Sequence, residues 1–147
     1  MRVFALAAVC LLTACASTYT PDPRDPVDMT GELGNRAREY VALGDVCNAR
    51  SPGGLYRQVI LETVEAEQAA LGPLGGLMER AHRGRATPER DAFVSAQMLA
   101  GGYSAAEYCS MMVVEAQAVI SNRAASIRRL SAQPDLVQYA RDMERGP

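Results

Sequence analysis

The chain contains no lysine: all 15 basic residues in its 147-residue sequence are arginines. This absence excludes any reaction that uses a lysine amine as a nucleophile or in a Schiff base. It also excludes a covalent link to peptidoglycan through a lysine side chain. Against 17 acidic residues the net charge is −2, which is too small to indicate a nucleic-acid partner.

Other residues that catalysis or metal binding requires are also scarce. His82 is the only histidine, and no cysteine or carboxylate is spaced around it in a ligand pattern. No serine lies in a Gly-x-Ser-x-Gly motif. Gly72, Gly75 and Gly76 lack the lysine and hydroxyl of a phosphate-binding loop. We therefore expect a protein that is not an enzyme and that has no metal and no cofactor.

The sequence also lacks an apolar run long enough to cross a membrane, which takes roughly 20 residues. A shorter run from Val3 to Ala14 follows the positive charge of Arg2, as is typical of a secretory signal. The run ends in Leu12-Thr13-Ala14-Cys15, an aliphatic residue, two small residues and a cysteine. This stretch resembles the lipobox of bacterial lipoproteins.

The resemblance implies that residues 1–14 are a signal peptide and that Cys15 carries the lipid at the mature N-terminus. An aspartate directly after the lipidated cysteine would resemble an inner-membrane retention signal, but this position is Ala16. The resemblance therefore implies the periplasmic face of the outer membrane. Several acyl chains would anchor the protein stably, whereas one chain alone binds only marginally. The alternative is ordinary signal cleavage after Ala16, because Ala14-Cys15-Ala16 also fits a small-x-small pattern.

Residues 15–29 form the predicted link between the lipid and the folded domain. Pro21, Pro23 and Pro26 alternate here with charged residues, which favours an extended, semi-rigid tether. A disordered leader with no defined reach is the alternative. The remaining residues, 30–147, are the predicted helical domain.

Two cysteines remain after Cys10 leaves with the signal and Cys15 takes the lipid. In an oxidising compartment we expect Cys47 and Cys109 to form a structural disulfide. A redox pair usually has Cys-x-x-Cys spacing, and a metal site needs more ligands than two cysteines and one distant histidine. The disulfide would close a loop of about 60 residues, which stabilises the fold by roughly 4 kcal/mol.

Apolar residues recur at spacings of three and four, and no stretch alternates apolar and polar residues as a strand does. The sequence therefore predicts an all-α fold: a small, disulfide-closed bundle of four main helices plus a short C-terminal helix. The expected helices are residues 32–47, 55–71, 87–101, 105–130 and about 134–144. Their predicted caps are Thr30, Thr87 and Ser104, the last in a capping box with Glu107.

The third predicted helix differs from the others in its pattern. Its apolar residues, including Phe93, Val94 and Leu99, lie on more than one face. This pattern has two interpretations: the helix is well buried, or it contacts a partner. A polar connection with several arginines, residues 79–90, precedes it.

Two charged groups are candidate site residues. Glu67 and Arg123 each lie on the apolar face of their helix, so we expect them to meet as a buried ion pair. The alternative is that Glu67 binds a cationic partner in a pocket. Arg80, Arg83 and Arg85 are candidates for contact with lipid phosphates or lipopolysaccharide, because arginine suits phosphate oxygens.

By architecture alone, a small, disulfide-closed helical lipoprotein is similar to the pilotins of secretion systems. The resemblance implies an accessory or adaptor protein that holds a segment of a partner protein in a groove between helices. The methionines and Phe93 are the candidate lining of that groove. The alternative function is a structural envelope lipoprotein that self-associates or contacts lipid or peptidoglycan.

Overall fold

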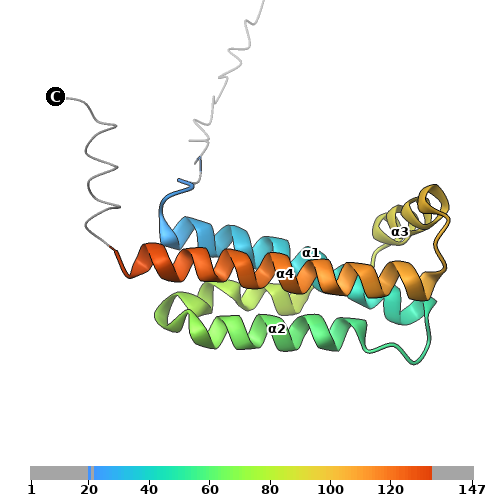
Figure 1. Ribbon diagram of the computed structural model, residues 1–147, viewed down its shortest axis with the longest axis horizontal. Helices are drawn as coiled ribbons and strands as arrows, with labels where there is room; N and C mark the ends of the chain where they lie inside the picture. The colour runs from blue at the N-terminus through green and yellow to red at the C-terminus, as the bar shows by residue number, and fades with distance from the viewer. Residues whose placement is uncertain (1–19, 21, 134–147) are drawn as a thin grey trace, which may run out of the picture.

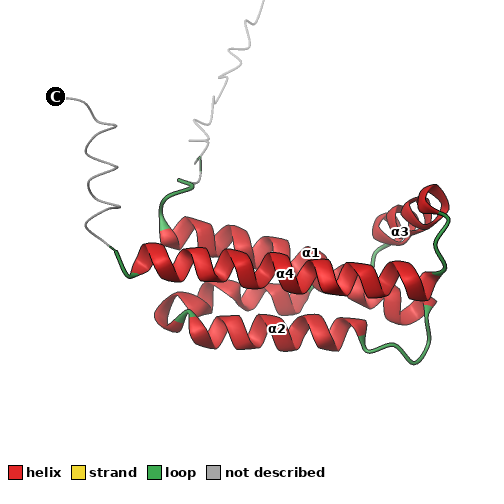
Figure 2. Cartoon of the chain, viewed as in Figure 1, coloured by secondary structure: helices red, strands yellow, loops and turns green. Residues whose placement is uncertain are grey.

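The computed structural model describes residue 20 and residues 22–133 (Figure 1). The signal peptide, the lipidation site Cys15 and the short C-terminal helix that the sequence predicts lie outside these residues. The described chain is all-helical, as predicted, and contains no strand (Figure 2). In chain order the helices are α1 (Pro26–Arg50), α2 (Tyr56–Ala70), the 3-10 helix η1 (Gly72–Arg83), α3 (Pro88–Gly101) and α4 (Ala105–Ser131).

Helix α1 begins earlier than the sequence pattern indicated. The side chain of Asp25 caps it by accepting a hydrogen bond from the backbone N–H of Val27 at 2.8 Å, and Pro26 occupies the first helical turn. The predicted start near residue 32, with Thr30 as the cap, is wrong. Thr30 is fully buried inside α1, where its hydroxyl donates to the carbonyl of Pro26 at 2.6 Å. The last residues of the predicted tether therefore belong to the first helix.

The segment after α2 is helical where the sequence predicted, in its second half, a polar connection. It forms one continuous 3-10 helix, η1, which packs on α1 and α2 and buries Met78 and Ala81. Gly34 of α1 permits this packing, because a Cβ there would lie 2.7 Å from the carbonyl oxygen of Leu77. The predicted connection at residues 79–90 is consequently much shorter and spans only residues 84–87.

The predicted caps of the last two helices are confirmed. Thr87 accepts a hydrogen bond from the backbone N–H of Arg90 at 3.3 Å. Ser104 accepts from the backbone N–H of Glu107, whose carboxylate accepts from the backbone N–H of Ser104 at 2.9 Å. Gly102 ends α3 in the left-handed conformation, with a φ of 67°, which turns the chain toward α4.

Helices α1, α2, η1 and α4 lie side by side and form the body of the molecule (Figure 1). Each contributes to a single hydrophobic core, and most of its members are fully buried. The core residues are Leu33, Ala37, Val41, Cys47, Ile60, Val64, Leu71, Met78, Ala81, Cys109, Met112, Ala116, Ile120, Ala124 and Ile127. These residues include most of the apolar positions that the helical periodicity predicted to face inward.

Helix α3 does not belong to this core. It projects from one end of the body, opposite the end where α1 begins (Figure 1). Only Val94 of α3 is buried, and its main contact is with α1. Phe93 and Leu99 are exposed, at 51% and 86%. Of the two interpretations of its apolar pattern, burial within the chain is therefore wrong.

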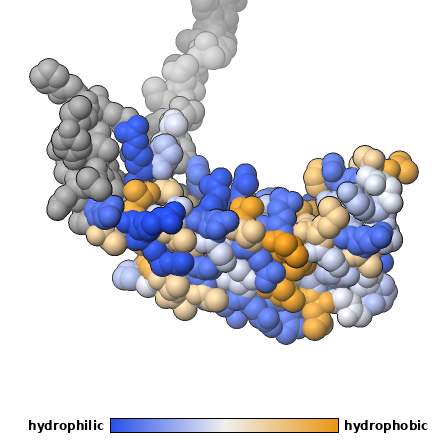
Figure 3. All heavy atoms as spheres, viewed as in Figure 1, coloured by the Kyte–Doolittle hydropathy of each residue, from blue (hydrophilic) through white to orange (hydrophobic). Residues whose placement is uncertain are grey.

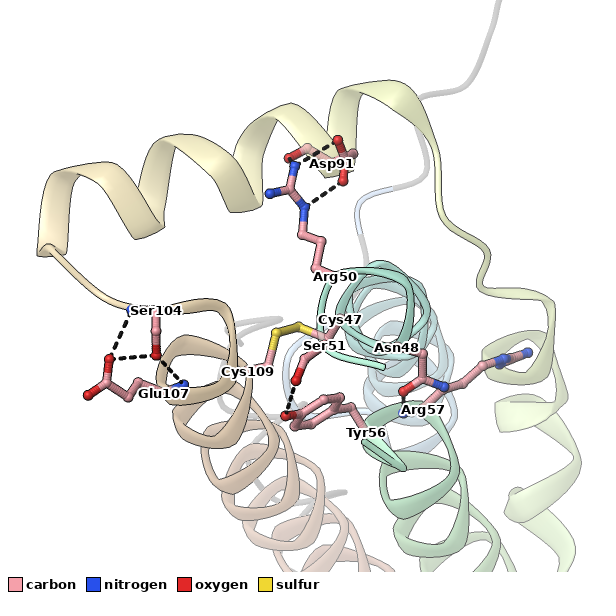
Figure 4. The surroundings of a disulfide bond; sticks show 10 residues. All are labelled: Cys47, Asn48, Arg50, Ser51, Tyr56, Arg57, Asp91, Ser104, Glu107 and Cys109. Carbon is pink, nitrogen blue, oxygen red and sulfur yellow. Dashed lines mark hydrogen bonds and ion pairs between the residues drawn. A yellow bond between two sulfur atoms is a disulfide. The ribbon is translucent and has the colours of Figure 1, made fainter. Parts of the chain in front are cut away.

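The predicted disulfide is present and joins the end of α1 to the start of α4 (Figure 4). The Cα atoms of Cys47 and Cys109 are 5.7 Å apart, and both residues are fully buried. The 62-residue separation between them contains α2, η1 and α3. Within residues 22–133, no helix combines the length and the hydrophobicity that crossing a bilayer requires.

Candidate functional site

A cleft of about 760 Å³ lies between α3 and the body, and we call it the α3 cleft. Figure 3 shows α3 rising from one end of the molecule, with hydrophobic side chains on the neighbouring surface of the body. The lining residues come from α1, α3, the turn after α3 and the first half of α4. They are Arg36, Glu39, Tyr40, Leu43, Phe93, Gln97, Ala100, Gly101, Tyr103, Tyr108, Met111, Met112 and Glu115.

Three helices present one face each to this cleft. On α1 the lining residues are 36, 39, 40 and 43, and on α4 they are 108, 111, 112 and 115. Both sets have the i, i+3, i+4, i+7 spacing of a single helical face. On α3 the residues are 93, 97, 100 and 101, which also share one side. The α3 cleft therefore has the arrangement of a bundle with one helix position left open.

Aromatic residues are concentrated in this cleft. The described residues include five aromatic side chains, and four of them line it: Tyr40, Phe93, Tyr103 and Tyr108. The fifth, Tyr56, lies elsewhere and donates its hydroxyl hydrogen to Ser51 at 3.2 Å (Figure 4). In a chain with 5% aromatic residues this clustering marks the α3 cleft as the candidate binding site.

The part of the lining that is open to solvent combines apolar side chains with the exposed polar residues Arg36, Gln97 and Glu115. Phe93 and Met111 are half exposed, while Met112 lies deeper, at the edge of the core. A second hollow of about 460 Å³ shares Leu43 and Phe93 with the cleft and continues it toward the start of α3. Of the residues predicted to line a groove, Phe93, Met111 and Met112 lie in the α3 cleft, whereas Met78 is buried in the core.

Two ion pairs attach α3 to α1, in addition to the buried side chain of Val94. Arg50, in the last turn of α1, donates to both carboxylate oxygens of Asp91 at 2.6 and 2.8 Å (Figure 4). It also donates to the hydroxyl of Ser95. On the other side of the contact, Arg90 forms an ion pair with Glu39 of α1. The geometry of the cleft therefore depends on charged contacts at the start of α3.

These contacts change the acidity of both carboxyl groups. The hydrogen bond from Arg50 holds the pKa of Asp91 below its usual value. The hydrogen bond from Arg90 does the same for the pKa of Glu39, with its charge and that of Arg38 adding to the effect against partial burial. Both groups are therefore ionised at neutral pH, and protonation of either would weaken the attachment of α3.

Glu115 is an exposed acidic residue in the lining of the cleft. Its Oε1 accepts a hydrogen bond from the hydroxyl of Tyr40 at 3.0 Å, which links α4 to α1. Burial, together with the nearby Glu115 carboxylate, raises the pKa of both Tyr40 and Tyr108. Glu115 takes part in none of the ion pairs found among the described residues.

The predicted ion pair between Glu67 and Arg123 is wrong in its second partner. Glu67 does meet an arginine of α4, but that arginine is Arg128. Arg123 is exposed because it directly precedes the fully buried Ala124, and neighbouring helix positions point about 100° apart. Arg123 instead lies beside a shallow hollow whose other lining residues all belong to α1.

The three arginines predicted to contact phosphate do not form one group. Arg80 and Arg83 share a shallow hollow of about 370 Å³ with Arg38 of α1, and Arg80 also donates to the side chain of Asn35 at 3.1 Å. Arg85 instead turns back to the carbonyl groups of residues 82 and 84. Contact with phosphate stays a prediction.

Residues of metal or catalytic chemistry are not grouped in the described part of the chain. No three His, Cys, Asp or Glu side chains come together there as a possible metal site. His82 is half-buried and its Nε2 lies 3.4 Å from the side-chain oxygen of Gln68. Cys47 and Cys109, the two cysteines of the described residues, are joined in the disulfide.

No protein-family profile matches this chain, and no curated protein or solved structure matches it either. Any functional assignment therefore depends on the chemistry of the α3 cleft itself. Sequence reasoning missed three of its tyrosines and Glu115. The signal for them was available on α4, where Tyr108 and Glu115 complete the helical face that contains the two methionines.

Proposed function

We propose that this protein is a lipid-anchored, non-catalytic adaptor of the bacterial cell envelope, attached to the periplasmic face of the outer membrane. It holds a helix of a partner protein in the α3 cleft. The observation that carries this proposal is the arrangement of the cleft, in which three helical faces surround an open helix position. The clustering of aromatic and methionine side chains in the same place supports it.

The size of the cleft fits a helical ligand. A helix is about 10 Å wide, so two turns of it occupy roughly 800 Å³. The volume of the α3 cleft is about 760 Å³, and the adjoining hollow extends it. Phe93 and Met111, each about half exposed, supply the apolar contacts that such a helix would bury.

The position of the cleft suits a protein attached at its N-terminus. Tyr40 lies about 20 Å along α1 from Pro26, at a rise of about 1.5 Å per residue. Helix α3 is at the end of the body away from the start of α1 (Figure 1). An anchor at Cys15 would therefore place the cleft away from the lipid surface and leave it accessible to a periplasmic partner.

A structural envelope protein that self-associates is the second candidate. The observation in its favour is that exposed apolar residues extend beyond the cleft, to Leu99 of α3 and Val114 of α4. Contact between two copies would cover these residues without a client. This candidate predicts a homo-oligomer, whereas the adaptor requires a second kind of protein.

Native mass spectrometry of the protein, extracted gently from its own membranes, tests the proposal. We expect a complex with one defined second protein, and we expect Phe93→Ala to remove most of that partner. Val27→Ala is the matched control, because Val27 is equally exposed, at 51%, but lies at the other end of α1. A homo-oligomer in place of the complex would support the structural candidate instead.

The same spectra test the anchor. The mass of the monomer should include acyl chains on a chain that begins at Cys15, together with the loss of two hydrogens for the disulfide. A mature protein that starts at residue 17 and carries no lipid would contradict the membrane attachment. That result would not decide the adaptor function of the α3 cleft, which is tested separately by whether a complex with a second protein is found.

A further inference from the structure

The two acidic residues of the α3 cleft differ in whether they form an ion pair. Of its two acidic residues, Glu39 is already paired with Arg90 and Arg38. Glu115 forms no ion pair among the residues that the structure describes, and its carboxylate accepts a hydrogen bond from the hydroxyl of Tyr40. The cleft therefore contains one carboxylate whose charge is not balanced by a bound arginine.

Two tyrosine side chains line the cleft with this carboxylate. Tyr40 donates its hydroxyl hydrogen to Glu115 at 3.0 Å, and Tyr108 lies seven residues before Glu115 on the same face of α4. The hydrogen bond from Tyr40 also fixes the orientation of the carboxylate before any ligand arrives. A fixed carboxylate beside aromatic rings favours a cation, since rings attract cations at their faces and the carboxylate completes the charge.

We propose that the partner helix is amphipathic and inserts one arginine or lysine side chain between Tyr40, Tyr108 and the carboxylate of Glu115. Its apolar residues, one turn on either side, would pack against Phe93 and Met111. This inference rests on the proposed function of the α3 cleft and adds the chemistry by which the cleft selects its partner. Arg36 lies on the exposed rim and disfavours a second basic residue at that end of the helix.

The experiment selects peptides from a display library with the mature, lipidated protein in detergent micelles as the target. The library holds helical peptides of about 16 residues, roughly four turns, with every position varied. We expect enriched peptides with apolar residues at helical spacing and one basic residue in their centre. An enriched peptide is then compared with its citrulline counterpart, which keeps the shape of arginine and removes the charge.

The wild-type protein should bind the arginine peptide about tenfold more tightly than the citrulline peptide. Glu115→Gln should reduce this preference to less than about twofold while leaving the affinity for the citrulline peptide unchanged. Tyr40→Phe keeps the aromatic face but removes the hydroxyl that orients the carboxylate, so it should lower the preference partly. Glu65→Gln, on the exposed side of α2, is the matched control and should keep the full tenfold difference.

The outcomes separate the two proposals. Enrichment of apolar helices without a basic residue would overturn the cation site and leave helix binding intact. No enrichment of helices, or enrichment that survives Phe93→Ala, would overturn the proposed function of the cleft. Phosphocholine that displaces the arginine peptide at equal concentration would show a lipid headgroup site instead of a protein-selective one. A homodimer of this protein that excludes the peptide would also overturn the inference.

Discussion

The body and α3 are built on different interactions. Helices α1, α2, η1 and α4 share one apolar core, and a disulfide joins α1 to α4. Helix α3 contributes no residue to that core and buries only Val94. Its contacts with α1 are mainly the ion pairs of Arg50 with Asp91 and of Arg90 with Glu39.

This difference has a functional meaning. Apolar burial and a cross-link stabilise the body, whereas partly exposed ion pairs contribute little each. Among helices α1, α2, η1, α3 and α4, we therefore expect α3 to have the lowest local stability. It is also one wall of the α3 cleft, so the cleft can widen for a ligand without cost to the core.

The largest expected effect comes from removing the cross-link of the body. Replacing both Cys47 and Cys109 with alanine should lower the free energy of unfolding by about 4 kcal/mol, since the bond closes a 62-residue loop. Chemical denaturation of the variant and the wild type measures the difference. A change below about 1 kcal/mol would show that the apolar core alone holds α1 against α4.

Replacing one buried residue in each part compares the stability of the body with that of α3. Ile120 of α4 and Val94 of α3 are both fully buried. Ile120→Ala should destabilise the whole body by about 3 kcal/mol, whereas Val94→Ala should cost about 1 kcal/mol. Amide hydrogen exchange should show faster exchange throughout the body in the first variant and in α3 alone in the second. Equal, global effects of both variants would contradict the separate attachment of α3.

The sequence predicted the number and type of the main helices because their apolar spacing is regular and two of their caps are explicit. It misplaced the start of α1, although Asp25-Pro26 is the same kind of signal as Thr87-Pro88, a capping side chain followed by proline. At Pro26 that signal lies within a run of alternating prolines, so local composition favoured a tether. The helix continues there because Thr30 and Leu33 are buried in the body, which is a tertiary effect.

The same limit applies to the candidate site. Helical spacing placed Met112 on the apolar face of its helix, because positions on one helix are fixed relative to each other. It did not reveal that Tyr40 of α1 meets Glu115 of α4, since that contact depends on how the helices are aligned. The arginine that pairs with Glu67 was misassigned for the same reason: periodicity gives a face but not the height along a neighbouring helix.

The corrected pairing provides a test of moderate size within the body. Glu67 is 15% exposed, so Arg128→Met would leave a mostly buried carboxylate without its partner and should cost about 1 kcal/mol. Arg123→Met, at an exposed position of the same helix, should change stability by less than about 0.5 kcal/mol. Thermal unfolding of the two variants compares them directly, and a larger loss for Arg123→Met would restore the original pairing.

The smallest effect on global stability, and the one that most directly tests the comparison, is expected from acid. The pKa values of Glu39 and Asp91 are lowered from ordinary values of 4.5 and 3.8, by hydrogen bonds from Arg90 and Arg50 respectively. Groups with lowered pKa values stabilise the fold above their unfolded values, and this contribution is lost as the pH falls through the folded ones. Helix α3 should therefore detach below about pH 4 while the disulfide-closed body stays folded.

NMR signals of α3 that shift together in this range, ahead of those of α2 and α4, would be the expected result. Arg50→Ala should produce the same signals at neutral pH, and simultaneous loss of all helices on acidification would show that α3 and the body are one cooperative unit.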